Sequence, residues 1–345
     1  MTHVTRINLA LQGGGAHGAF TWGVLDALLD REDIEVAGIS GTSAGALNGA
    51  AFKSGMVEGG RDGARATLDR VWAEMAGISD FRMAGWLAPA IPANAALTSA
   101  MQAAVPFAWL ETLGALSTPY AYGPFYRNPL AQVVDKLDCG RLGHPEGPAL
   151  HVCATNVRTG KVRVFSGDQV TPDAILASAC LPEIFQAVEI EDAETGRVDP
   201  YWDGGYSGNP ALFPLFDPAL PRDIVVVQIN PMERDGTPRT PEEIHNRLNE
   251  ITMNSSLLRE LRAIDFVRRL LAQNHLPDGM MKDVLMHVIA DDALMGDLSV
   301  RTKLAPSPVL LVRLKEAGRA ACQKFLDTHG DKLGREASLD LRATM

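Results

Sequence analysis

The sequence predicts an α/β fold in which a mostly parallel sheet is covered by helices. A strand, a glycine-rich turn and a helix follow one another twice within the first 53 residues, which is the pattern of parallel strands joined by helical crossovers. Hydrophobic residues make up 46% and charged residues 21% of the 345 residues, as in a folded globular protein. The length suits roughly two domains, or one large α/β domain with an appendage.

The first half of that pattern is carried by two short apolar runs. They predict strands at 7–11 and 34–40, each ended by a glycine-rich turn. Apolar residues at helical spacing predict the helices that follow, at 16–31, 46–53 and 61–76.

Strands and helices continue to alternate in the rest of the chain. The sequence predicts helices at 128–138, 171–180, 240–274 and 316–328, two strands within 149–166, and strands at 223–229 and 284–289. Thr240, Pro241 and Glu243 form the strongest helix start, with an N-cap, a proline at N1 and a capping-box glutamate. On that helix we expect a buried apolar stripe made of Ile244, Leu248, Ile251, Leu258, Leu261 and Leu271.

The segment 81–126 differs from its surroundings, because it holds eight of the 21 aromatic residues and very few charges. An irregular subdomain packed on the sheet is the favoured interpretation. The alternative is a lid or wall of an apolar substrate pocket, where aromatic side chains commonly gather.

Composition excludes several classes of protein. The net charge of −10 argues against a nucleic-acid binder and against strong adsorption to anionic membranes. The four cysteines lie far apart without ligand spacing, and no calcium-loop motif occurs, so we expect no metal and no cofactor. The N-terminus has too few apolar residues for a signal peptide, and no later run is long enough to span a membrane, so a cytoplasmic protein is expected.

Residues 41–45, Gly-Thr-Ser-Ala-Gly, form a G-x-S-x-G motif where a strand turns into a helix. A nucleophilic serine on so sharp a turn needs small neighbours, which Gly41 and Gly45 provide. The N–H groups at the start of the following helix favour negative charge near Ser43. The competing interpretation is a tight turn with Ser43 as a helix cap.

The first glycine turn, Gly-Gly-Gly-Ala-His-Gly at 13–18, allows two functions. A dinucleotide site would need an acidic residue at the end of the second strand, and that strand ends in Ile39-Ser40-Gly41 without a carboxylate. In an acyl hydrolase, the same loop would present backbone N–H groups to the oxyanion of a tetrahedral intermediate. A purely structural turn remains the third interpretation.

A base for Ser43 is harder to find in the sequence. The histidines after it, His245, His275, His287 and His329, lie in patterns typical of structural positions, and His17 lies beside the glycine turn. Asp203-Gly204-Gly205 is by itself only a turn signal.

Taken together, these motifs resemble the patatin-like phospholipases. The resemblance covers roughly residues 7–210 and includes the glycine loop, the Ser43 motif, the Asp203 motif and the segment from Ala177 to Phe185. It implies a three-layer α/β/α fold and a Ser–Asp dyad, with Ser43 as nucleophile and Asp203 as base. It also implies an oxyanion hole built from Gly13, Gly14, Gly15 and Ala16, with Gly18, Gly41, Gly45, Gly204 and Gly205 supporting the motifs.

The resemblance further implies how the chain is divided. Residues 5–215 would form the catalytic core, with 81–126 inserted, and 220–345 would add the remaining strands and a C-terminal helical extension that is not an independent domain. One departure stands at His17, where many relatives carry arginine or lysine. A neutral imidazole offers less electrostatic attraction for an anionic phosphate head group.

The implied activity is hydrolysis of lipid acyl esters, of phospholipase A, lysophospholipase or esterase type, through an acyl-enzyme. The alternatives are an acyltransferase using the same acyl-enzyme, an inactive lipid-binding scaffold, and, least favoured, a nicotinamide enzyme. The expected partner is a lipid or other apolar ester, with transient contact to a membrane surface. Arg259, Arg262 and Arg269 could touch lipid phosphates, although a solvated helix face is the favoured interpretation.

Overall fold

A single mixed sheet forms the centre of the molecule. The computed structural model describes residues 4–344 except 79–80, 82–117, 193–194 and 278. Within this part of the chain the sheet has eight strands in the order β5-β6-β3-β2-β1-β7-β8, with β4 paired to β3. The strands are β1 (Thr5–Leu11), β2 (Ile34–Thr42), β3 (Ala149–Asn156), β4 (Val162–Ser166), β5 (Val188–Glu191), β6 (Val198–Asp203), β7 (Asp223–Val227) and β8 (Leu285–Ile289).

The strands that build the centre of the sheet run parallel, and the edge near β6 is antiparallel. β1, β2, β3, β7 and β8 pair in parallel, whereas β4 and β6 pair antiparallel to β3. The α-helices are α1 (Ala19–Leu28), α2 (Ala44–Ala76), α5 (Ala131–Val134), α6 (Pro172–Ser178), α7 (Pro241–Ala272), α8 (Asp292–Gly296), α9 (Val300–Leu304), α10 (Pro308–His329) and α11 (Leu341–Thr344).

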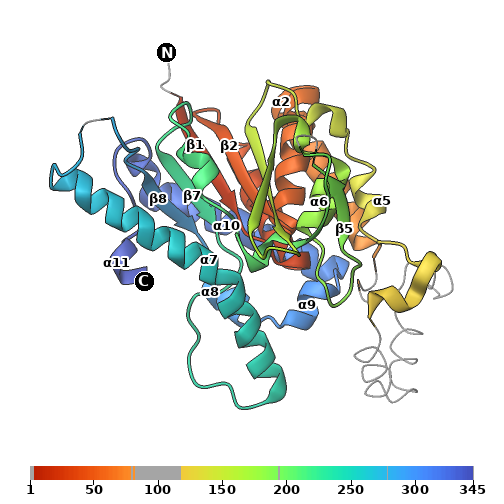
Figure 1. The fold of residues 1–345 in the computed structure, drawn as a ribbon. Helices are drawn as coiled ribbons and strands as arrows, with labels where there is room; N and C mark the ends of the chain where they lie inside the picture. The colour runs from red at the N-terminus through yellow and green to blue at the C-terminus, as the bar shows by residue number, and fades with distance from the viewer. Residues whose placement is uncertain (1–3, 79–80, 82–117, 193–194, 278, 345) are drawn as a thin grey trace.

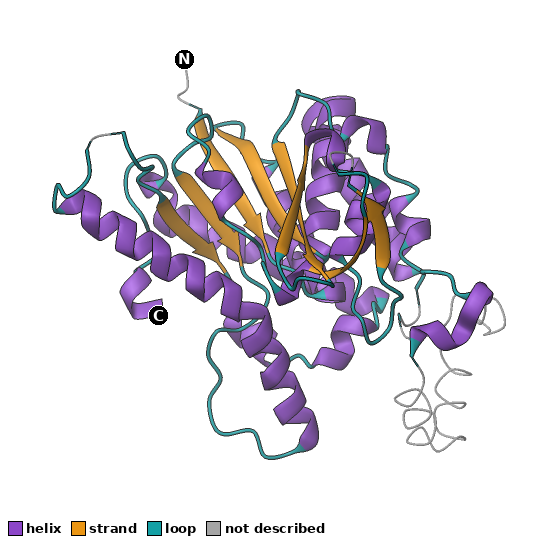
Figure 2. Ribbon diagram, viewed as in Figure 1, coloured by secondary structure: helices purple, strands orange, loops and turns teal. Residues whose placement is uncertain are grey.

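Helices cover both faces of the sheet, which gives the expected three layers (Figures 1 and 2). Side chains alternate along β7, so Val225 and Val227 join the core beneath α1, α2 and α10, whereas Ile224 and Val226 pack under α7. A strand buried on both faces has to be apolar throughout, which explains the continuous run Ile-Val-Val-Val in this strand.

The C-terminal helix α10 packs closely against α1. A Cβ on Gly318 would lie 2.0 Å from the carbonyl oxygen of Phe20, so only a glycine permits this approach of the two helices. The carboxylate of Asp26 on α1 reaches across the contact and pairs with Arg65 on α2 and Arg319 on α10. Residues near the end of the chain are thereby fixed to one of its first helices.

Most of the predicted elements are confirmed, including the helices at 46–53 and 61–76, which are the two halves of α2 on either side of a kink at Gly59 and Gly60. Three differences stand out. The helix predicted at 128–138 is reduced to the short α5. The hairpin of β5 and β6 was missed, because β5 has only four residues and β6 contains Pro200, which disfavours a strand. Residues 82–117 of the aromatic segment 81–126 lie outside the described residues.

The predicted apolar stripe of the helix that follows Thr240 is the third difference. The capping box at Thr240 and Glu243 is confirmed. However, Ile244, Leu248 and Ile251 are exposed, and the buried side is formed further along α7 by Met253, Leu257, Leu261 and Ile264. The first turns of α7 extend past the body of the sheet (Figure 1), so the helical period alone could not identify the side that packs.

Among the helices that the structure describes, none combines the length and the apolar character that a membrane crossing requires.

Candidate active site

The three motifs come together because of the register in which the strands pair. Leu11 at the end of β1 pairs with Gly41 on β2, and Thr42 on β2 pairs with Cys153 on β3. Ala154, the next residue of β3, pairs with Asp203 at the end of β6. The residues that follow β1, β2 and β6 are therefore neighbours, although they are far apart in the sequence.

Ser43 lies on a strained turn between β2 and α2. Its φ of 55° and ψ of −121° lie outside the regions that non-glycine residues favour. Two hydrogen bonds connect this turn to strand β3. The Ser43 N–H donates to Ser178 Oγ at 2.8 Å, and the Ser178 hydroxyl donates to the Cys153 carbonyl at 2.6 Å. Gly45 permits the turn, since a Cβ there would lie 2.1 Å from the carbonyl oxygen of Leu11.

The carboxylate of Asp203 lines the same pocket as Ser43, and the Ser43 side chain is near enough to lower the pKa of that carboxyl. The backbone of Asp203 is fixed on both sides, by its own N–H donating to the Cys180 carbonyl at 2.7 Å and by the Thr155 hydroxyl donating to its carbonyl at 2.8 Å. One carboxylate oxygen also accepts the N–H of Gly205 at 2.7 Å. The carboxylate is thus aimed at Ser43 by its neighbours.

Burial changes the acidity of this carboxylate. Loss of hydration raises the pKa of Asp203 from its ordinary 3.8 to about 7, and the N–H of Gly205 and the side chain of Ser43 offset only part of that rise. An aspartate with a pKa near 7 is a far better proton acceptor than an exposed aspartate.

The glycine loop passes directly over Ser43. A Cβ on Gly13 would lie 2.7 Å from the Ser43 Cβ, so this position has no room for a side chain. The N–H of Gly13 donates to Asn209 Oδ1 at 2.6 Å and is therefore already engaged within the protein. Gly14 caps and Gly15 begins the short helix η1 (Gly15–Gly18), and the first N–H groups of a helix have no acceptor within it.

A buried network of amide side chains holds the loop in place. Gln12 Oε1 accepts the N–H groups of Ile229 and Asn230, and Gln12 Nε2 donates to Asn254 Oδ1, all at 3.0 Å. Asn230 Nδ2 donates to the Gly13 carbonyl at 2.8 Å, and Asn209 Nδ2 donates to the Met253 carbonyl at 3.1 Å. Fully paired buried amides of this kind fix a single geometry.

His17 faces away from Ser43 and binds α9. Its Nε2 lies 2.7 Å from Thr302 Oγ1. Burial, helped by the charge of Lys303, lowers the pKa of His17 well below its ordinary value, so its imidazole is neutral near pH 7. His17 is thus a structural contact between the glycine loop and α9.

A narrow pocket of about 80 Å³ opens onto Ser43. Its polar groups are those of the loop, Ser43, Asp203, Asn249 and Lys303. The rest of its wall is apolar and includes Leu47, Met75, Phe81, Leu130, Ala179, Leu181, Ile184, Phe185, Met253, Val300 and Leu304. Asp203 and Lys303 are the only charged side chains among the described residues of this lining.

The other histidines that the sequence offered as bases lie elsewhere. His245 and His275 are exposed, and His329 stacks against Phe325. His287 is buried on β8, with Nε2 at 3.1 Å from Asp223 Oδ1 and Nδ1 at 2.9 Å from Ser338 Oγ. That arrangement has the residue types of a Ser-His-Asp triad, but it lies outside the pocket at Ser43 and connects the C-terminal segment to the sheet.

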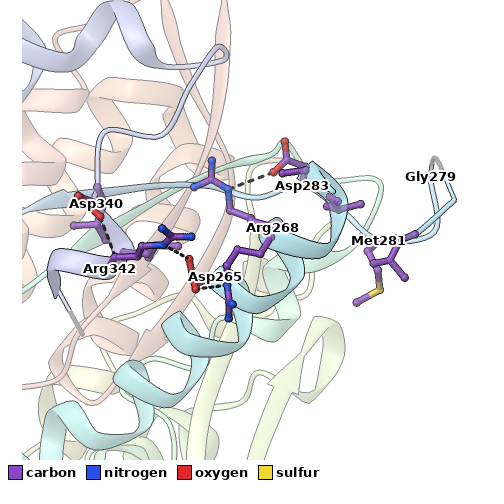
Figure 3. A pocket seen from close by; sticks show the side chains of 13 residues that line it. Asp265, Arg268, Gly279, Met281, Asp283, Asp340 and Arg342 are labelled. Atoms are coloured by element: carbon purple, nitrogen blue, oxygen red, sulfur yellow. Dashed lines mark hydrogen bonds and ion pairs between the residues drawn. The ribbon is translucent and has the colours of Figure 1, made fainter. Parts of the chain in front are cut away.

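A wider hollow of about 620 Å³ lies at the far end of α7 (Figure 3). Its arginines and aspartates neutralise one another, since Arg269 pairs with Asp265 at 2.9 Å and Arg268 with Asp283 at 3.5 Å. Arg342 also lies 3.9 Å from Asp265. Because these charges are mutually satisfied, we place the candidate site at the smaller pocket over Ser43.

Across the described part of the chain, no group of three or more histidine, cysteine, aspartate or glutamate side chains is arranged to hold a metal ion.

Several residues of the site carry no signal in the sequence. Lys303, Asn249 and Met253 reach the pocket from α9 and α7, more than 200 residues after Ser43. Gln12 directly precedes the glycine loop, so its position in the sequence could have indicated a role there. The hydrogen-bond partners of its side chain lie at least 197 residues later and could not be predicted.

Comparison with known proteins agrees with the motifs. A family described as patatin-like phospholipase matches residues 9–216, which is more than half of the chain. No curated protein matches. The crystal structure of VipD from Legionella pneumophila aligns with a TM-score of 0.43 and 16% sequence identity, over 99% of this chain and 72% of that one.

Proposed function

Because the chain belongs to the patatin-like phospholipase family, we propose that it hydrolyses carboxylic esters of lipids through a Ser43–Asp203 dyad. The observation that carries the proposal is that one pocket brings together Ser43 on a strained turn, the buried carboxylate of Asp203 and a loop of backbone N–H groups. The apolar wall of the pocket suits an acyl chain or another apolar ester substrate.

In the first step Ser43 Oγ attacks the ester carbonyl while Asp203 accepts the hydroxyl proton. The carbonyl π electrons move onto oxygen, and the resulting oxyanion binds the N–H groups of Gly14 and Gly15. Of the four residues that the resemblance implies, Gly13 is left out because its N–H is engaged by Asn209, and Ala16 is left out because it does not line the pocket. One such donor is worth roughly 10²–10³ in rate.

Collapse of this intermediate breaks the bond to the alcohol, which leaves with the proton held by Asp203, and an acyl-enzyme remains on Ser43. Water then attacks the acyl carbonyl as Asp203 takes a proton from it. The second collapse returns that proton to Ser43 and releases the fatty acid. Asp203 must be ionised at the start of each half, so activity is expected to fall below about pH 7.

This pH limit lies in the range where a histidine would also titrate. Burial of Asp203 moves its own titration into that range. A fall in activity near pH 7 therefore does not by itself indicate a catalytic histidine. If Asp203 causes this fall, it should remain when His17, the histidine nearest the loop, is replaced.

We also propose that residues 220–345 belong to the same folding unit as 5–215. β7 and β8 are strands of the same sheet, α7 covers one of its faces, and α10 packs on α1.

The function is tested with a fluorophosphonate probe and with p-nitrophenyl butyrate, a short ester that suits the narrow pocket. The wild type is expected to be labelled and to hydrolyse the ester, and Ser43→Ala to do neither. Ser338→Ala is the matched control, because Ser338 is also a serine beside a histidine and a carboxylate, and it should behave as the wild type. Labelling of Ser43→Ala at the wild-type rate would refute the assignment.

A further inference from the structure

Lys303 reaches the catalytic pocket from α9, which lies beyond the residues that match the family. α9 is packed directly on the glycine loop. A Cβ on Gly15 would lie 2.3 Å from the Lys303 carbonyl oxygen, and Gly15 has a φ of +58° that only glycine adopts readily. The neighbouring Thr302 binds His17 at 2.7 Å. The position of Lys303 is therefore coupled to that of the loop.

The ammonium group is held by two neutral amides. Lys303 Nζ donates to Asn230 Oδ1 and to Asn249 Oδ1, each at 2.8 Å. Asn230 in turn donates to the Gly13 carbonyl at 2.8 Å, so a chain of two hydrogen bonds joins the ammonium to the loop. An ammonium has three N–H donors, and among the described residues no third acceptor is found for this one.

Within the described part of the chain, no carboxylate is hydrogen-bonded to this ammonium to cancel its charge. The charged groups that face Lys303 are Glu250 on α7, Arg234, and Asp203 across the pocket. Glu250 is itself bound by Arg234 at 2.6 Å and by Arg247 at 3.2 Å, so most of its charge is directed to those arginines. The glycine loop offers no other cation, because His17 is buried and neutral.

We propose that Lys303 supplies the positive charge of the oxyanion site, acting on the negative charge that develops at Gly14 and Gly15. This proposal rests on the proposed function, since it needs the Ser43 reaction. Lys303 transfers no proton; it stays an ammonium through both steps while the electron pair moves onto the carbonyl oxygen and back. Asn230 and Asn249 are its positioning residues. A cation in an apolar, water-poor pocket interacts strongly with such a charge.

Titration of Lys303 gives the proposal a signature that a structural role would not produce. Burial lowers the pKa of Lys303 to about 8. Ester hydrolysis by the wild type should therefore rise near pH 7, as Asp203 ionises, and fall again above about pH 8, as Lys303 loses its charge. The rise near pH 7 and the fall above pH 8 belong to two different residues, so a substitution at one residue can change one of them without the other.

The experiment measures kcat and KM for p-nitrophenyl butyrate from pH 6 to 10 in the wild type, Lys303→Met and Lys303→Arg. Lys303→Met should lower kcat by roughly 10- to 100-fold at pH 7.5 with little change in KM, and its profile should lack the alkaline fall. Lys303→Arg should restore most of the rate and move the alkaline fall beyond pH 10, because a guanidinium keeps its charge. Lys282→Met is the control, since Lys282 is bound to the carbonyls of Leu215 and Asp217 instead.

Fluorophosphonate labelling distinguishes failure of the proposed function from failure of the proposal for Lys303. Loss of labelling only in Ser43→Ala establishes the nucleophile, whatever Lys303 does. If Ser43 is the nucleophile but the alkaline fall is the same in the wild type and Lys303→Arg, the proposal for Lys303 is wrong. This comparison uses only the wild type and Lys303→Arg, so it remains valid even if the Lys303→Met variant does not fold. An effect of Lys303→Met on KM alone would likewise overturn it.

Discussion

Replacing Asp203 with asparagine should abolish hydrolysis and at the same time stabilise the protein. The carboxylate of Asp203 is buried, and loss of hydration raises its pKa to about 7. An asparagine keeps the Oδ1 that accepts the Gly205 N–H but never carries a charge. The carboxylate that we propose as the base is therefore also a source of instability that its removal would relieve.

The sign and size of this effect follow from proton linkage. In the unfolded chain Asp203 loses its proton near pH 4, whereas in the folded protein it keeps the proton up to about pH 7. Between these values the folded state binds more protons, so wild-type stability falls as pH rises and levels off above pH 7. At ~1.4 kcal/mol per pH unit, the advantage of Asp203→Asn should grow by up to about 3 kcal/mol from pH 5 to pH 8.

Thermal unfolding at pH 5, 6, 7 and 8 measures this difference. In a protein of this size the Tm gap between Asp203→Asn and the wild type should widen by roughly 4 °C across the series. Asp62→Asn is the control, because the Asp62 side chain is 99% exposed and its replacement should give a gap that does not change with pH. A constant gap for Asp203→Asn as well would refute the reasoning that burial raises the pKa of the base.

Two further substitutions test the parts of the fold that support the site. Gly318→Ala places a methyl group 2.0 Å from the Phe20 carbonyl, so α10 must move from α1, and we expect a loss of about 3 kcal/mol or more by urea unfolding. Gly296→Ala has open space around its Cβ and should change stability little; equal losses in both would contradict the close helix contact. Asn209→Ala removes the acceptor of the Gly13 N–H and should lower kcat at least ~10-fold with intact secondary structure by circular dichroism; an unchanged kcat would show that the loop is held without it.

The sequence was sufficient wherever the information is local. Strand β1 and the turn after it follow from four apolar residues and three glycines. The start of α7 follows from Thr240, Pro241 and Glu243, because an N-cap hydrogen bond spans only three residues. Ser43 was proposed from a motif whose small residues the sharp turn requires, whereas Asp203 was proposed only through the resemblance to a family.

Local patterns failed where exposure depends on distant parts of the chain. Ile244, Leu248 and Ile251 have the spacing of a buried stripe, yet they are exposed, because the first turns of α7 extend past the sheet. The period of a helix shows which residues share a side, but only its neighbours decide whether that side is buried.

The sequence by itself determined the strands, the sharp turn at residue 43 and the kinds of group that the chemistry uses. Only the tertiary structure decided that burial raises the pKa of Asp203 to about 7, that Asn209 engages Gly13, and that α9 brings Lys303 to the glycine loop. Hydration, burial and charge depend on every group within a few ångströms, and here those groups come from segments up to about 290 residues apart.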